Sequence, residues 1–437
     1  MYSNSKKRQG KTISCGEAAM RLLTKYGVDT VFGIPGVHTL EYCRGLRDGP
    51  IRHVQVRNEQ GAGFMADGYA RGSRSPGVAL VISGPGVTNA LTAIGQSWAD
   101  SIPVLLLSSE TNSSTHGKGW GALHEIPDQR ALTAQLTALS ARAKSPEDVP
   151  ELIGQAFSVF YSQRPRPVHI SIPIDVLSQP VSEDWIAMQL PKRAQPNSDE
   201  IKAAANLLRS AKRPLLMIGG GAVGASVTVR KLMEQLKAPV VCSTAGKGIV
   251  PDDHLLSLNA STVRPEVQSF ISTADVILAL GTELAETDSF VDSLDFRGEI
   301  IRIDLDPRKI NDQYPSKIGI VADANASILA LLDEGGYKSK RQGKKIYTEI
   351  EMIRQKIIGN LSVSEKQHVR LLNALADQMP DDTFYAGDIC QLVYTGAFGM
   401  NVGSPGCWSY PAGYCALGCG LPNAIGAKIA QPDRHVV

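Results

Sequence analysis

The chain alternates short β-branched runs with longer segments of helical period, and this alternation constrains its fold more than any other feature. It is typical of βαβ units, in which helices connect parallel strands. In the first third, it predicts strands at 30–32, 53–56, 78–83, 104–108 and 168–172, and helices at 15–26, 59–71, 88–99 and 146–160. The sequence therefore predicts an α/β protein of doubly wound parallel sheets.

Two polar stretches divide this alternation into three blocks. The segment 180–198 is rich in proline and polar residues, and the segment 333–345 (DEGGYKSKRQGKK) is charged and contains glycine, as is typical of linkers. A length of 437 residues suits about three domains. We therefore predict three doubly wound domains. They are expected at 10–180, 196–333 and, as a partial domain, 365–437.

Composition and charge exclude several classes of function. The net charge of +2, from 45 Lys and Arg against 43 Asp and Glu, gives no basic footprint for nucleic acid. The longest apolar runs are about five residues, too short to span a bilayer. The polar start MYSNSKKRQGKTIS lacks the apolar stretch of a secretory signal. We expect a cytoplasmic protein with no nucleic-acid or membrane partner.

The cysteines are not expected to bind metal. The chain has seven, an odd and scattered set that favours reduced thiols. Cys407, Cys415 and Cys419 lie close together, but they form no CxxC pair and their neighbours are glycine and alanine. Small buried residues are the better interpretation, so we predict no metal site within the chain.

A candidate carboxylate directly follows the strand 53–56, in the run RNEQGAG (57–63). Such a strand-to-helix junction lies at the carboxyl edge of a parallel sheet, where ligands bind. Glu59 could simply complement the helix dipole. However, Gly61 and Gly63 cost helix propensity and indicate a close approach. The preceding apolar residues predict burial, and a buried carboxyl is usually paired or used.

Three further motifs leave two interpretations each. The turn SGPGVTN (83–89) is either an anion site or a tight turn capped by Thr88 or Asn89, and it matches neither a dinucleotide fingerprint nor a P-loop. The nominal GxGxxG at 219–224 is not followed by an acid at the end of the strand 240–242, so an NAD site is weakly supported. The other interpretation is a nucleotide site that does not read the adenine ribose through an acid. His124, in the glycine-containing loop 117–129, is a proton-transfer group or a surface histidine.

The third block contains two further candidate segments. GDICQ (387–391) follows the strand 383–386, and a glycine-rich run (408–422) precedes a helix expected at 423–430. Small residues at this spacing allow a flat ligand or another chain to approach the backbone. A tight helix-packing face would produce the same pattern.

In order, these motifs resemble those of thiamine-diphosphate-dependent enzymes of the acetolactate synthase type. The resemblance covers about residues 12–437. The matching segments are 57–71 (RNEQGAGFMADGYAR), 83–105, 164–176, 301–310 and 413–430 (GYCALGCGLPNAIGAKIA). It implies a pyrimidine-binding domain, a central domain and a diphosphate-binding domain. It also implies a cofactor held between subunits, and hence a homodimer or homotetramer.

The resemblance assigns roles to individual residues. Glu59 matches the carboxyl that bonds the aminopyrimidine ring of thiamine diphosphate, and Leu417 matches the apolar residue that supports the bent cofactor. His124 falls where acetolactate synthases usually carry glutamine, so a different substrate or proton-transfer role is expected. The other positions expected at the cofactor are Pro85, Asn89, Asp388, Ile389, Gln391, Gly413 and Tyr414.

The run 117–133 (GKGWGALHEIPDQRALT) most resembles the branch that decarboxylates 5-guanidino-2-oxopentanoate, the keto acid of arginine. We therefore expect a non-oxidative 2-oxo acid decarboxylase. A guanidinium tail calls for a carboxylate partner, with Asp388 and Glu125 as candidates. The alternatives are an acetolactate synthase that condenses two pyruvates, with FAD near 219–222, and a non-catalytic paralogue or assembly subunit. FAD is not favoured, because related decarboxylases keep this domain empty.

The resemblance also bears on magnesium. Family members continue from the strand expected at 433–437 into a Gly-Asp-Gly motif and asparagines that hold Mg²⁺ against the diphosphate. The Mg²⁺ ligands are therefore expected beyond Val437. The chain as given is expected to bind the cofactor poorly and to be inactive alone.

Overall fold

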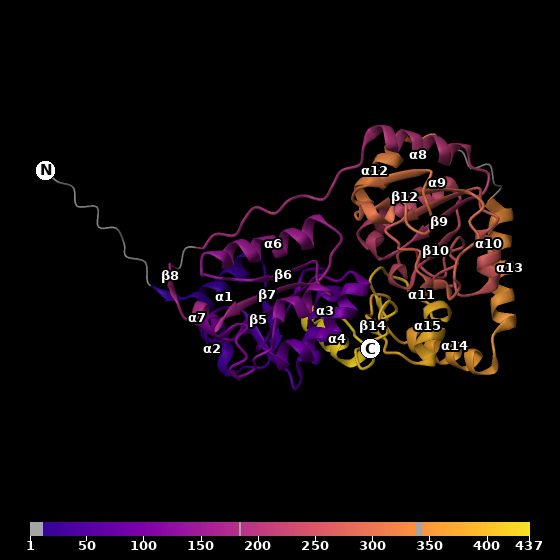
Figure 1. The fold of residues 1–437 in the computed structure, drawn as a ribbon. Helices are drawn as coiled ribbons and strands as arrows, with labels where there is room; N and C mark the ends of the chain where they lie inside the picture. The colour runs from indigo at the N-terminus through magenta and orange to yellow at the C-terminus, as the bar shows by residue number, and fades with distance from the viewer. Residues whose placement is uncertain (1–11, 183–184, 338–342) are drawn as a thin grey trace. The chain divides into compact units, whose positions relative to one another are not determined.

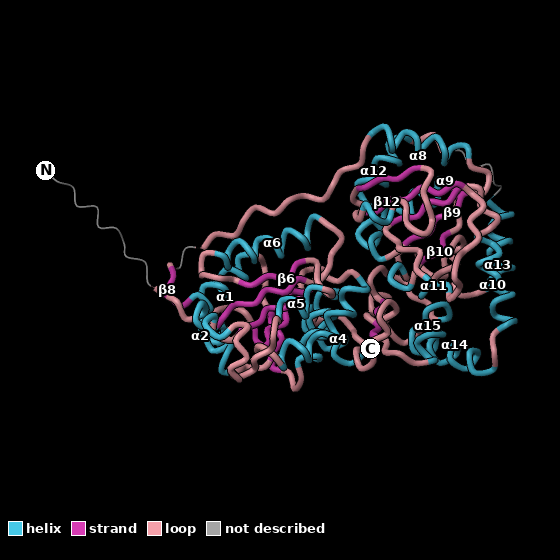
Figure 2. Tube along the Cα trace, in the orientation of Figure 1, coloured by secondary structure: helices cyan, strands magenta, loops and turns pink. Residues whose placement is uncertain are grey.

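The computed structural model describes residues 12–182, 185–337 and 343–437. Positions 10–11 of the first predicted domain, and 183–184 and 338–342 of the two predicted linkers, lie outside the described residues. The chain forms two compact units, Met1–Pro191 with Ile425–Ala430, and Lys192–Ala424 with Gln431–Val437. In each unit, helices surround a parallel sheet (Figures 1 and 2).

The first unit contains a six-stranded parallel sheet in the order β3-β2-β4-β5-β7-β6. Its strands are β2 (Thr30–Gly33), β3 (Arg52–Gln55), β4 (Gly77–Val81), β5 (Val104–Glu110), β6 (Leu139–Arg142) and β7 (Val168–Pro173). A separate antiparallel pair joins β1 (Ile13–Ser14) to β8 (Pro180–Val181). The helices are α1 (Cys15–Lys25), α2 (Leu40–Asp48), α3 (Glu59–Ser73), α4 (Pro85–Asp100), α5 (Gln129–Ala134), α6 (Asp148–Ser162) and α7 (Ile174–Leu177).

Alternating side chains of β4 enter two different cores. Val78 and Leu80 pack in one core with residues of α1, α2 and α6, whereas Ala79 and Val81 pack in the other with residues of α3 and α4. Successive strand residues point to opposite faces, so β4 is buried on both sides. The sheet is therefore doubly wound.

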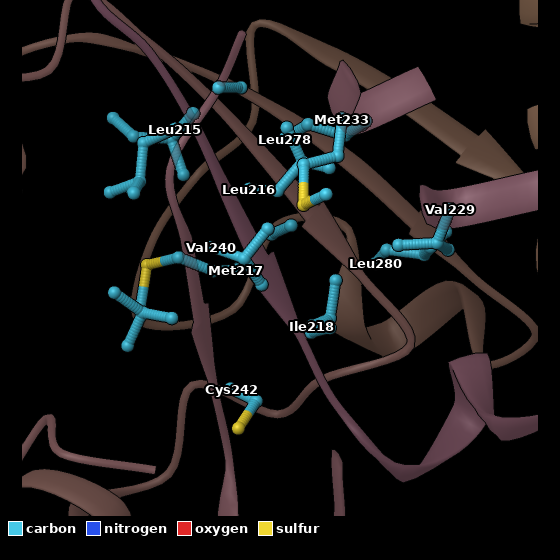
Figure 3. Close-up of a cluster of buried hydrophobic side chains, with 14 of the residues drawn as sticks. Leu215, Leu216, Met217, Ile218, Val229, Met233, Val240, Cys242, Leu278 and Leu280 are labelled. Atoms are coloured by element: carbon cyan, nitrogen blue, oxygen red, sulfur yellow. The ribbon is translucent and has the colours of Figure 1, made fainter. Parts of the chain in front are cut away.

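The second unit contains a five-stranded parallel sheet in the order β10-β9-β11-β12-β13. Its strands are β9 (Pro214–Ile218), β10 (Val240–Cys242), β11 (Val276–Leu280), β12 (Glu299–Asp304) and β13 (Ile318–Val321). Side chains of β9, β10 and β11 pack with Val229 and Met233 of α9 (Figure 3). The helices of this part are α8 (Ser198–Ser210), α9 (Ser226–Leu236), α10 (Pro265–Ile271), α11 (Glu286–Ser289) and α12 (Ala324–Glu334).

The last segment adds a short parallel pair to these elements. Tyr385 of β14 (Tyr385–Ala386) pairs with Trp408 of β15 (Trp408–Ser409), and Phe384 bridges to Val436 in parallel. The helices here are α13 (Gly343–Asn360), α14 (Val363–Ala376), α15 (Gln391–Gly399) and α16 (Gly420–Ala430). No helix in the described ranges combines the length and apolar character needed to cross a membrane.

The predicted α/β class with parallel sheets is confirmed, and several element predictions need correction. α6 begins at Asp148 rather than Pro146, because the Asp148 carboxylate accepts from the N–H groups of Lys144 and Ser145 and holds them in a turn. The elements that the sequence patterns did not predict include α2, α5, β6, β13 and the start of α13, which lies inside the predicted linker 333–345. β6 is only half-buried and has no β-branched run, so it lacked a strand signal.

Candidate cofactor site

Glu59 is the first residue of α3, at the carboxyl edge of the first sheet. The N-cap Asn58 is extended and its side chain accepts from the N–H of Gln60. Glu59 is 8% exposed, which confirms the predicted burial. Its Oε2 accepts a hydrogen bond from Asn89 Nδ2 at 2.9 Å, whereas Oε1 has no hydrogen-bond partner among the described residues. The carboxylate is thus fixed by one oxygen and available at the other.

The turn after β4 differs from the predicted capped turn. α4 begins at Pro85 rather than Thr88, and no side chain caps its N-terminus. Gly84 has φ +59°, and a Cβ there would lie 2.4 Å from the carbonyl oxygen of His124. Asn89 therefore lies inside the helix and its amide is directed to Glu59. Only glycine allows this turn and the loop that carries His124 to pack so closely.

A buried polar network supports the same turn. Gln129 Oε1 accepts from the N–H of Gly84 at 2.9 Å, and its Nε2 donates to Ser108 Oγ at 3.0 Å. Ser108 Oγ lies 2.8 Å from Nε2 of the fully buried His169. Burial, with a smaller contribution from Arg142, lowers the pKa of His169 to about 3, so its imidazole is neutral. The sequence motifs did not reveal this network, because its members come from separate elements: Ser108 from β5, Gln129 from α5 and His169 from β7.

His124 belongs to the predicted loop, and its backbone is strained. It has φ +62°, and its side chain is half-buried. The Glu125 carboxylate accepts from the N–H groups of Gly119, Gly121 and Ala122, which closes the loop on itself. His124 Nδ1 is buried and has no hydrogen-bond partner in the part of the chain that the structure describes.

His38 was not found from the sequence, yet its ring lies 5.3 Å from that of His124, at an interplanar angle of 71°. It lies in the turn Val37–Thr39 after β2, and its Nδ1 is 2.6 Å from Ser83 Oγ. Burial, and secondarily His124, lowers the pKa of His38. The rule that ligands bind where the strand order reverses, here between β2 and β4, could have identified it.

The candidates of the second unit surround Asp388. Its carboxylate accepts from the N–H groups of Ile389, Gly418 and Gly420, at 2.8, 3.0 and 3.0 Å. It therefore ties the glycine-rich run to the end of β14. Tyr414 and Leu417 are 49% and 67% exposed. Gly413 and Gln391 are also exposed, and Gln391 begins α15.

The glycines that follow β9 pack against the backbone of the turn that follows β11. Gly221 N–H donates to the Gly281 carbonyl, and a Cβ on Gly219 would lie 2.3 Å from that same oxygen. The cavity at this edge has about 10 Å³, room for about one water molecule. In the described residues, no group of three or more His, Cys, Asp or Glu side chains could hold a metal ion.

Comparison with known families decides the class of protein. The N-terminal TPP-binding domain of thiamine pyrophosphate enzymes matches residues 13–132, and the central domain of these enzymes matches residues 201–331. This chain belongs to the thiamine pyrophosphate enzymes. The resemblance inferred from the sequence motifs is therefore confirmed.

Individual relatives narrow the likeness within this family. The chain is 50% identical to the probable 2-ketoarginine decarboxylase AruI of Pseudomonas aeruginosa, over 97% of this chain and 76% of that protein. It is 31% identical to the acetolactate synthase isozyme 3 large subunit of Escherichia coli, over 97% and 77%. It is 30% identical to an acetolactate synthase of Mycobacterium bovis, over 96% and 70%. 2-Ketoarginine is 5-guanidino-2-oxopentanoate, so the predicted likeness to that branch is confirmed.

Proposed function

We propose that this protein is a thiamine-diphosphate-dependent decarboxylase of a 2-oxo acid, with 5-guanidino-2-oxopentanoate as substrate. The observation that carries the proposal is Glu59, a buried carboxylate held by Asn89 at the carboxyl edge of the N-terminal sheet. The 50% identity to a relative named for this substrate supports the choice of keto acid. The acetolactate synthases are more distant relatives, at about 30% identity.

Glu59 fits the pyrimidine half of the cofactor. Thiamine diphosphate, when bound, supplies the electron sink for decarboxylation. Glu59 would hold a proton at the pyrimidine ring nitrogen through Oε1, and Asn89 would keep the carboxylate in one orientation through Oε2. Burial would strengthen that hydrogen bond by excluding water. Pro85, the first residue of the helix that carries Asn89, would form part of the same wall.

We assign His124 to proton transfer at the substrate. Its buried Nδ1 is unusual, because buried polar atoms are normally hydrogen-bonded. A substrate or product oxygen would satisfy that nitrogen, and an imidazole can carry the proton near neutral pH. In the second unit, the cofactor contacts that we propose are Asp388, Ile389, Gln391, Gly413, Tyr414 and Leu417. The exposure of Leu417 supports its role as the apolar support.

The two carboxylates considered for the guanidinium tail are poorly suited to that role. Glu125 and Asp388 each already accept three backbone hydrogen bonds. Pairing either one with a guanidinium would compete with the bonds that order its own loop. We therefore assign neither residue to the guanidinium; Glu125 would hold its own loop in place, and Asp388 would order the segment that contacts the cofactor while contacting it itself.

The remaining assignments follow from the family. We propose three domains, at 10–180, 196–333 and 365–437. The family matches to residues 13–132 and 201–331 support the first two. Mg²⁺ would bind with the cofactor diphosphate, which needs a hard cation with oxygen ligands. A homodimer or homotetramer in the cytoplasm is also proposed. The seven cysteines, all described and all thiols, support this compartment.

The full-length protein with thiamine diphosphate and Mg²⁺ should release carbon dioxide from 5-guanidino-2-oxopentanoate. Carbon dioxide release and the aldehyde product are measured, with pyruvate and 2-oxopentanoate as comparison substrates. The proposal requires a higher kcat/KM for the guanidino acid than for 2-oxopentanoate, which lacks the guanidinium group. Acetolactate formed from pyruvate alone would instead support a synthase. No turnover of any 2-oxo acid would support a non-catalytic paralogue.

A further inference from the structure

His38 lies beside the candidate residue His124, at the switch point of the first sheet, which is the place where the strand order reverses. β2 and β4 are neighbours, and the strand order reverses there, because β3 lies beyond β2 and β5 beyond β4. The turn Val37–Thr39 follows β2, and Ser83 and Gly84 follow β4. Diverging connections leave a crevice at such a point, where ligands of α/β proteins bind.

We infer that His38 is a positioning residue that holds the imidazole of His124 in its working orientation. This inference rests on the proposed role of His124 in proton transfer. Its basis is the edge-to-face contact of the two rings, together with the anchoring of His38 to Ser83. His38 itself is 9% exposed and is not assigned contact with cofactor or substrate.

The anchor of His38 is itself well supported. Its Nδ1 lies 2.6 Å from Ser83 Oγ, and the N–H of Ser83 donates to Ser109 Oγ at 3.1 Å. Ser109 belongs to β5, so the contact reaches the centre of the sheet. A ring fixed at one nitrogen to a rigid strand end can support a neighbouring side chain precisely.

His124 needs such support, because no hydrogen bond in the described residues holds its buried Nδ1. Its backbone is fixed by the contact with Gly84 and by the Glu125 carboxylate that closes the loop. The ring itself can still rotate about its side-chain bonds. The contact with His38 at 5.3 Å, in the edge-to-face geometry that aromatic pairs prefer, restricts that rotation.

Electrostatics also favour His38 as the positioning group and His124 as the proton-transfer group. Two imidazolium ions in this contact would repel one another, and burial already disfavours a charge on His38. The lowered pKa favours the neutral form of His38 at this contact. Ser83, which lies beside its Nδ1, is uncharged.

Kinetics of the full-length protein test the positioning role. His38→Ala should lower kcat about tenfold with KM changed by less than about threefold, because a misplaced proton donor slows chemistry more than binding. His38→Phe keeps the ring edge and should recover most of the loss. His53→Ala, on the edge strand β3, is the matched histidine control and should leave kcat unchanged. A kcat within twofold of wild type in His38→Ala overturns the inference.

A measurement without substrate separates this inference from the proposed function. The chain has eight histidines, so ¹³C labelling of their rings gives a resolvable set of NMR signals. His124→Gln should raise the pH midpoint of the His38 signal, because one of its two pKa-lowering causes is removed. His38→Ala should shift and broaden the His124 signal, whereas His53→Ala should not. Unchanged signals would overturn the pairing even if decarboxylation is observed, and shifted signals would support it even if the substrate is another keto acid.

Discussion

The two large sheets share the start of their strand order but use the switch point differently. In the first sheet, the turns after β2 and β4 bring together His38, Ser83 and Gly84, with His124 alongside. In the second, the backbones of the turns after β9 and β11 meet directly, as Gly221 donates to Gly281. The first switch point thus carries two imidazole rings in edge-to-face contact, whereas the cavity at the ends of β9 and β10 has about 10 Å³.

This difference shows why glycine patterns alone are poor guides to ligand sites. The nominal GxGxxG of the second sheet has better fingerprint spacing than SGPG in the first. Its glycines, however, allow two backbones to touch, whereas Gly84 allows a backbone to touch the loop of a candidate catalytic histidine. A glycine predicts close approach, and the identity of the approaching group decides the function.

Among the substitutions that test this difference between the sheets, Glu59→Gln should lower activity most, because Glu59 is the candidate carboxylate of the first sheet. We expect kcat/KM for the keto acid to fall at least about 100-fold, because the amide cannot exchange a proton with the pyrimidine ring. Steady-state carbon dioxide release measures this. Glu151→Gln, at an exposed position on α6, should retain full activity. Activity of Glu59→Gln within threefold of wild type would move the site away from the first sheet.

Gly219→Ala tests whether the second crevice is closed by packing. The added Cβ would lie 2.3 Å from the Gly281 carbonyl oxygen, so we expect a loss of about 2–3 kcal/mol in unfolding free energy. Gly224→Ala, where a Cβ meets nothing within 4 Å, is the control and should change stability by less than about 1 kcal/mol. Urea unfolding distinguishes the two. Equal stability of both variants would mean that the crevice can open.

Gly84→Ala applies the same change to the first crevice. The backbone of Gly84 (φ +59°, ψ −106°) is one that residues with a side chain rarely adopt, and an added Cβ would lie 2.4 Å from the His124 carbonyl oxygen, so we expect a stability loss at least as large as that of Gly219→Ala. We also expect kcat to fall about tenfold, since the His124 loop moves. Gly61→Ala, with open space around the added Cβ, is the control. A stability loss without a change in kcat would make this turn purely structural, like that of the second sheet.

His169 should make the first unit sensitive to acid. Its pKa is lowered from 6.5 to about 3 in the folded protein, so the unfolded chain binds a proton first as the pH falls. Stability should therefore decline below pH 6.5, by up to about 1.4 kcal/mol per pH unit until the pH approaches 3. Urea midpoints between pH 4.5 and 7.5 measure the slope. His169→Gln should flatten it, and an unchanged slope would assign the acid sensitivity to other groups.

Much of the fold followed from local patterns. The strands of both sheets that are buried on two faces, such as β4 and β11, appear as apolar β-branched runs. Half-buried β6 and the start of α13 lacked such a signal, and the start of α4 was misplaced because Gly84 ends the turn without a side-chain cap. Glu59 is buried as predicted, although the preceding strand β3 (Arg-His-Val-Gln) is only partly buried.

The sequence by itself determined the α/β class, the family and the candidate carboxylate Glu59, because each depends on residues near one another in the chain. Only the tertiary structure decided which groups meet at each crevice. His38, Ser83 and His124 come from three different connections, and the folding of the parallel sheet brings them together. In the second sheet, folding likewise brings two connections together, and there the backbones of Gly221 and Gly281 meet in a hydrogen bond.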